Sequence, residues 1–176
     1  LRGLGMPYVN ESHLVKAVHK FARENDAFLV TKLRHYQKPG ESVYSTYTDK
    51  VLGEDCFYPH SAMSLAAVSD LMVGFTTSGT PEAVWSGSPV LDIRVPGSRR
   101  DLLCESLHFW DGMLEHRGVV ESMSSIEVKA QLPGRKLDEF RMDPKARADY
   151  QNKFCGPDGG SFSGNVLDAV EDLVRE

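Results

Sequence analysis

The sequence predicts an α/β protein with a doubly wound parallel sheet, covered by helices in a three-layer αβα arrangement. Short, almost continuously apolar runs alternate with segments in which apolar residues have helical spacing. Such runs are typical of strands that are buried on both faces. The chain has 176 residues, 41% of them hydrophobic and 26% charged. This length and composition suit one globular domain spanning residues 1–176 and disfavour disorder.

Helical patterns begin near the N-terminus. The first helix is predicted at residues 10–25, where Asn10 or Ser12 can cap the first turn. Its apolar positions recur at intervals of three and four: Leu14, Val15, Val18, Phe21 and Ala22. Further helices are predicted at residues 61–68, 80–85, 124–131, 144–153 and, after a turn-rich segment, from 163 or 164 to 174.

The predicted strands lie between these helices. They occupy residues 27–33, 56–58, 70–75, 89–93 and 118–120. The first ends in a polar loop broken by Pro39 and Gly40, and the fourth ends in a loop rich in proline, glycine and arginine. Because helices separate most of the strands, a parallel sheet is expected.

Composition excludes several classes of protein. The net charge of −5 provides no broad basic field for nucleic acid. No apolar run approaches the length of about 18 residues that a membrane span requires. The cysteines Cys56, Cys104 and Cys155 are widely spaced and form no C-x-x-C pair. We therefore expect reduced thiols and a cytoplasmic location, without a disulfide framework or a zinc site.

The loop at residues 75–83 is the sharpest candidate site. Ligands of such sheets bind outside the carboxyl ends of the strands, where loops enter helices. Thr80 suits the cap of the following helix, and Pro81 suits its first position. Free N–H groups, the helix dipole and the hydroxyls of Thr77 and Ser78 would attract a phosphate. Gly79 would allow close approach of the backbone to this ligand.

Glu82 lies one turn into the same helix, within reach of a ribose diol. The structural alternative is an ordinary, well-capped helix start, in which Glu82 only complements the dipole. The loop matches neither the G-x-G-x-x-G nor the P-loop signature.

Two further loops carry polar candidates. Lys32 and Arg34 lie at the end of the first predicted strand and could pair with a diphosphate, although a solvated rim also explains them. The segment from Tyr58 to His60 could meet a base, whereas the alternative is that His60 simply starts a helix.

Other catalytic patterns are absent from the sequence. Asp55, Asp92 and Asp111 are too scattered to suggest a catalytic pair, and the histidines lack metal-ligand spacing. Ser78 stands in no G-x-S-x-G elbow. We therefore assign no catalytic residue and expect no metal site.

Residues 60–93 resemble a known family when taken together. A hydroxyl- and glycine-rich loop, Thr77-Ser78-Gly79, precedes Glu82 and the step Gly87-Ser88-Pro89-Val90 into the next strand. This order resembles the C-terminal, Rossmann-like domain of glycosyltransferases with the type B fold (GT-B). It is also similar to the non-hydrolysing UDP-N-acetylglucosamine 2-epimerase. The segment at residues 154–161 resembles the end of bacterial surface-polysaccharide enzymes of this group.

The resemblance implies a nucleotide-sugar as donor substrate, with no further cofactor. Ser78, Gly79 and Thr80 would hold its diphosphate, Glu82 its ribose, and the segment around His60 its base. Lys32 and Arg34 match loosely the basic residues found after an earlier strand. The acceptor would be a surface glycan or a lipid-linked molecule, met in the cytoplasm or at the membrane surface through the full-length protein.

Two departures from the family limit what this chain is expected to do. No convincing strand precedes the helix at residues 10–25, and we expect the N-terminal GT-B domain, which supplies the acceptor site, to lie outside these 176 residues. We therefore expect this fragment to bind without turnover. A 2-epimerase and a non-catalytic interaction domain of the same fold remain alternatives, because fold-level resemblance does not fix function.

Overall fold

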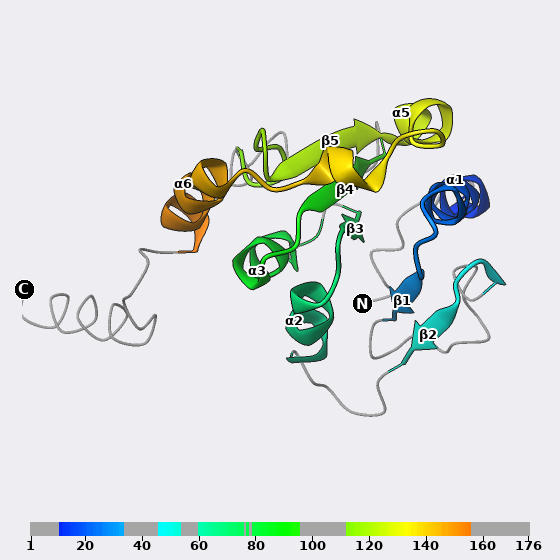
Figure 1. Cartoon of the computed structure of the whole chain (residues 1–176), viewed down its shortest axis with the longest axis horizontal. Coiled ribbons are helices and arrows are strands. Elements are labelled where there is room, and N and C mark those ends of the chain that lie inside the picture. The colour runs from blue at the N-terminus through cyan, green and yellow to red at the C-terminus, as the bar shows by residue number, and fades with distance from the viewer. Residues whose placement is uncertain are drawn as a thin grey trace, which may run out of the picture.

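A computed structural model describes residues 11–33, 46–53, 60–75, 77, 79–95 and 112–155. These segments form a mixed α/β structure with parallel strands, as the sequence predicts (Figure 1). The predicted strand at residues 56–58 and the predicted helix ending at residue 174 lie outside the described residues.

The described helices match the predicted ones closely. They are α1 (Glu11–Glu24), α2 (His60–Ala67), α3 (Gly79–Ser86), α5 (Ser125–Gln131) and α6 (Pro144–Phe154), with a short 3₁₀-helix η3 (Leu137–Phe140). Local caps explain two of the starts. Ser124 and Glu127 form a reciprocal capping box at α5, and the Asp143 side chain accepts a hydrogen bond from the Ala146 N–H at α6.

The strands form two parallel sheets. β1 (Val30–Lys32) pairs with β2 (Lys50–Leu52), and β3 (Met72–Gly74), β4 (Val90–Arg94) and β5 (Val120–Ser124) form a three-stranded sheet in that order. The sequence did not predict β2. It also placed the last strand at residues 118–120, whereas β5 continues to Ser124. The apolar run ends at Val120, so the strand extends through polar residues that pair with β4.

Helices pack on both faces of the three-stranded sheet. Leu91 and Ile93 of β4 face one core cluster with α1 and α5, which lie together in Figure 1. Val90 faces the opposite cluster with residues of α3 and α6. Alternate side chains of β4 therefore enter two separate cores, as expected for a strand buried on both faces.

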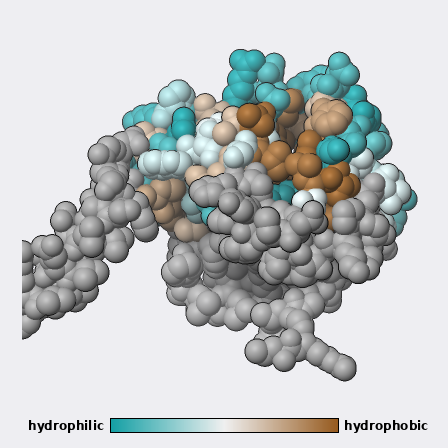
Figure 2. Space-filling model, turned by 90° about the horizontal axis from the view of Figure 1, so that it is seen from below, coloured by the Kyte–Doolittle hydropathy of each residue, from teal (hydrophilic) through white to brown (hydrophobic). Residues whose placement is uncertain are grey.

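Exposed apolar side chains also occur in the described part of the chain. Phe28 and Val68 are 72% and 80% exposed, and they stand just before β1 and β3. The view from below in Figure 2 shows apolar residues gathered on part of the described surface, bordered by polar ones. Because Phe28 and Val68 precede β1 and β3 in the chain, they lie near the amino ends of these strands, away from the carboxyl ends where ligands of such sheets bind.

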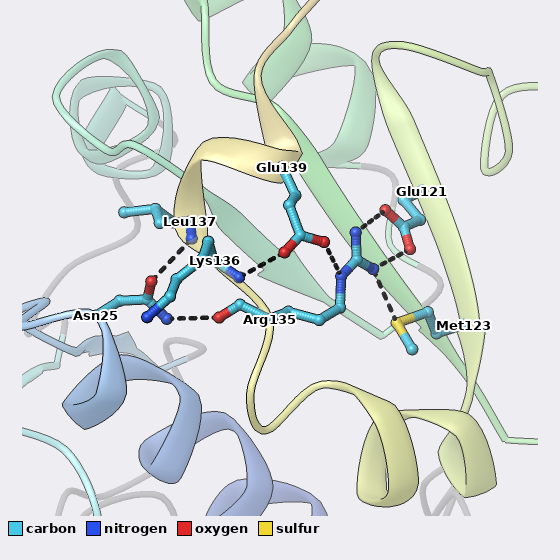
Figure 3. Close-up of polar contacts among 7 residues, drawn as sticks. All are labelled: Asn25, Glu121, Met123, Arg135, Lys136, Leu137 and Glu139. Atoms are coloured by element: carbon cyan, nitrogen blue, oxygen red, sulfur yellow. Dashed lines mark hydrogen bonds and ion pairs between the residues drawn. The ribbon is translucent and has the colours of Figure 1, made fainter.

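Arg135 joins β5 to the segment that follows α5 (Figure 3). Its guanidinium donates to the Glu121 carboxylate in β5 and, at 2.9 Å, to Glu139 in η3. It also lies over the Phe140 ring, 4.3 Å from the ring centroid. The bonds to Glu121 raise the pKa of Arg135, and the backbone N–H of Lys136 together with Arg135 lowers the pKa of Glu139.

Asn25, the residue after α1, connects the end of this helix to the same segment. Its amide group donates to the Arg135 carbonyl at 3.0 Å, and its carbonyl oxygen accepts from the Leu137 N–H at 2.9 Å (Figure 3). The end of α1 and the segment after α5 are therefore joined by polar contacts as well as by the shared core.

Replacing Arg135 by Met should lower the free energy of unfolding by about 1 to 2 kcal/mol, because Glu121 and Glu139 lose their charge-assisted partner. Urea unfolding measures this loss. Arg141→Met is the matched control. Within the described residues Arg141 pairs with its near neighbour Asp138, both side chains being 78% exposed, so its change should stay within about 0.5 kcal/mol. Equal losses in the two variants would contradict the role of Arg135.

Candidate functional site

The face of the three-stranded sheet that packs on α3 and α6 becomes polar toward its carboxyl end. Met72, Val90 and Val120 lie side by side in register. Two residues further along each strand, and therefore on the same face, the register partners are Gly74, Asp92 and Ser122. Asp92 is fully buried, and the Ser122 hydroxyl is buried without a hydrogen-bond partner in the described part of the chain. Polar groups buried here are costly, so they mark this end as a candidate site.

The opposite face shows no such change. Ile93 and Met123, which are register partners near the carboxyl end, both lie in the core formed with α1 and α5. At the carboxyl end, the buried polar groups of this sheet therefore lie on the side on which α3 begins. This is the end at which ligands of parallel α/β sheets bind.

Thr77 lies between β3 and α3 and accepts hydrogen bonds from the first N–H groups of the helix. Its hydroxyl accepts a hydrogen bond from the Gly79 N–H, and its carbonyl accepts one from the Thr80 N–H, each at 3.2 Å. Pro81 has no N–H to offer. A phosphate at this helix start would therefore have to replace Thr77 as the acceptor for Gly79.

Gly74 allows this loop to lie against the strand. A Cβ atom at Gly74 would stand 2.9 Å from the Thr77 Cγ2 atom, closer than real contacts permit. The missing side chain of Gly74 thus provides the space that Thr77 fills, beside the register partner Asp92.

The predicted cap at Thr80 is wrong. The helix begins at Gly79, and Thr80 lies within its first turn with no exposed surface. Thr80 shares a helix face with the buried residues Ala83 and Val84, which turns its side chain toward the sheet. Its hydroxyl is buried and has no hydrogen-bond partner among the described residues. In this conformation the Thr80 side chain has no surface with which to hold a diphosphate.

The other predicted site residues are distributed as follows. Glu82 is exposed in the first turn of α3, where a ribose could reach it. His60 is the first residue of α2, and Lys32 ends β1 in the other sheet, with its ammonium 3.5 Å from the Leu33 carbonyl oxygen. Ser78 and Arg34 lie outside the described residues. The structure thus places Thr77, Gly79 and Glu82 around one helix start, and their roles toward a ligand stay predictions.

The sequence analysis missed the polar row at Asp92 and Ser122. It set Asp92 aside because no second aspartate was near in sequence, although a carboxylate within the apolar run of β4 was a usable signal. Burial is the main cause that raises the pKa of the Tyr150 hydroxyl of α6, and the neighbouring Cys155 and Asp92 contribute less. This hydroxyl donates to the Met113 carbonyl at 2.9 Å.

In the segments that the structure describes, no group of three or more His, Cys, Asp or Glu residues is placed to hold a metal ion. None of the described helices is long and apolar enough to cross a membrane. Comparison with protein-family models, with curated proteins and with solved structures gives no match to this chain.

Thr77→Ala should lower the free energy of unfolding by about 1 kcal/mol, because the Gly79 N–H loses its acceptor at the helix start. Urea unfolding with circular dichroism detection provides the measurement. Thr46→Ala, a substitution at an exposed position, should change stability much less. A Thr77→Ala protein as stable as the wild type would show that Thr77 does not cap α3.

Thr80→Val should leave stability unchanged or raise the free energy of unfolding by about 1 kcal/mol. The substitution replaces a buried hydroxyl that lacks a partner by a methyl group. Thermal and urea unfolding of the two proteins compare them directly. A clear loss of stability would mean that the Thr80 hydroxyl has a hydrogen-bond partner in solution.

Proposed function

We propose that this chain binds a nucleotide-sugar as the C-terminal domain of a GT-B glycosyltransferase that acts in surface-glycan biosynthesis. One observation carries the proposal: β3 of a parallel sheet leads through a hydroxyl- and glycine-rich loop into α3, where the adjoining sheet face turns polar. Helix starts at the carboxyl ends of parallel strands are favourable sites for phosphates. We further propose that the complete sheet is doubly wound.

The donor diphosphate would lie at the start of α3, against the backbone of Ser78 and Gly79. A phosphate oxygen would replace the Thr77 hydroxyl as the acceptor for the Gly79 N–H, so that this donor stays paired in both states. The exposed carboxylate of Glu82 would accept hydrogen bonds from the ribose hydroxyls. In this proposal His60 approaches the base, while Lys32 and Arg34 balance the charge of the diphosphate.

The reaction would take place between this domain and an N-terminal domain. An acceptor hydroxyl would attack the anomeric carbon and lose its proton to a base of the N-terminal domain, while the bond from that carbon to the diphosphate oxygen would break and release the nucleoside diphosphate. The dipole of α3 would stabilise the charge on the departing nucleotide. The partner domain would provide the acceptor site, so the chain alone would bind without turnover. The acceptor would be a glycan or a lipid-linked molecule at the cytoplasmic side of a membrane.

Calorimetric titration with UDP, CDP, GDP, ADP and their sugar conjugates tests the proposal. We expect one nucleotide to bind and Glu82→Ala to weaken it at least five-fold, which corresponds to about 1 kcal/mol for the loss of a hydrogen bond to a charged group. Asp149→Ala, which removes an exposed carboxylate from α6, should leave the affinity unchanged.

Two outcomes would contradict the proposal. The first is that no nucleotide binds, either to this chain or to the full-length protein. The second is a nucleotide affinity that Glu82→Ala leaves unchanged. For the full-length protein, release of free nucleotide only with an acceptor indicates sugar transfer. A change in sugar stereochemistry without an acceptor would instead identify a 2-epimerase.

A further inference from the structure

We propose that Arg147 of α6 is a positioning residue, which fixes the direction of α3 and thereby aims its N-terminus at the ligand. The effect on ligand affinity rests on the proposed function. The contact between Arg147 and α3 does not, and it can be tested separately.

α3 depends on its surroundings for stability. It has eight residues, about two turns, and a helix of this length is not stable alone in water. Its buried residues Ala83 and Val84 fix one face against the sheet. Apolar contacts are non-directional, so they hold the helix on the sheet more firmly than they set its angle.

The C-terminus of α3 is closed by a glycine motif that does not pair every carbonyl of the last turn. Gly87 has a positive φ of 101°, and its N–H donates to the Val84 carbonyl at 3.1 Å. The Ser88 N–H donates to the Ala83 carbonyl at 3.0 Å. This pair of bonds is the Schellman arrangement. It does not include the carbonyl of Trp85.

Arg147 binds the Trp85 carbonyl. Its Nη2 atom donates to the Trp85 carbonyl at 2.8 Å, and its Nε atom donates to the Val84 carbonyl at 3.3 Å. A rigid guanidinium that binds two successive carbonyls restrains orientation as well as position. Its positive charge also complements the negative end of the helix dipole.

The residue that follows α6, Cys155, contacts the first turn of α3 as well. The Cys155 thiol lies 3.8 Å from the Pro81 carbonyl and donates a weak hydrogen bond to it. α6 is itself fixed to the sheet, because Tyr150 is fully buried in the core that contains Val90 and Val120. A fixed helix thus holds both turns of the shorter one.

Small rotations of α3 would matter for a ligand. At 1.5 Å per residue the helix is about 12 Å long, so a tilt of about 5° around its C-terminus moves its N-terminus by about 1 Å. A displacement of about 1 Å can remove most of the benefit of a well-placed group. Arg147 therefore acts on the site from the far end of the helix.

Hydrogen exchange of the 176-residue chain tests the contact without any ligand. Arg147→Gln should raise the exchange rates of α3 amides at least ten-fold and leave those of β4 unchanged. Arg147→Lys keeps the positive charge but cannot bind both carbonyls as the guanidinium does, so its exchange rates should be intermediate. Arg141→Gln, at an exposed position, is the matched control and should behave as the wild type. Exchange in α3 that is the same in all four proteins would overturn the proposal.

Measurements of nucleotide affinity then show whether Arg147 positions α3 for the ligand or only stabilises the helix. The probes are the nucleoside diphosphate that binds most tightly in the titration above and its parent nucleoside. Arg147→Gln should weaken the diphosphate at least ten-fold and the nucleoside less than two-fold, with partial recovery in Arg147→Lys. Faster hydrogen exchange of the α3 amides together with an unchanged affinity for the diphosphate would overturn the positioning role. Absence of nucleotide binding by both the wild-type chain and the full-length protein would instead overturn the proposed function, while the exchange data would still decide whether Arg147 holds α3.

Discussion

The structure depends on the burial of β4 on both faces. β4 is the central strand of the three-stranded sheet, and its side chains alternate between the core of α1 and α5 and the core that includes α3 and α6. A shift of register by one residue would exchange these two sets of contacts and place Asp92 in the apolar core. The pairing of β4 with β3 and β5 therefore fixes the helices on both sides, and with them the start of α3.

The helices were predictable because their signals are local. Ser124 with Glu127, and Asp143 with Pro144, mark the starts of α5 and α6 within a few residues of sequence. The strands were harder. β5 continues through serines that are strand residues only because β4 pairs with them. β2 is three residues long, and Asp49, just before it, is tied to Leu29 in a distant part of the chain. Such pairings leave no local pattern.

The candidate site was predictable in place but not in detail. The loop before α3 has the right residue types, and the structure puts Thr77, Gly79 and Glu82 together there. The burial of Thr80 could have been inferred, because it stands three residues before Ala83 on the apolar helix face. The contribution of Arg147 could not, because its hydrogen bonds reach residues that are far away in sequence.

Because Thr77 lies so close to Gly74, a substitution at either position limits which residues the other can carry. The Thr77 methyl group occupies the space that a side chain at position 74 would need. Among sequences that share this fold, a larger residue at position 74 should therefore accompany a smaller residue at position 77. Serine at position 77 would keep the hydroxyl that accepts from the Gly79 N–H, whereas alanine or glycine would remove it, so the residue allowed in the strand decides how the helix start is capped.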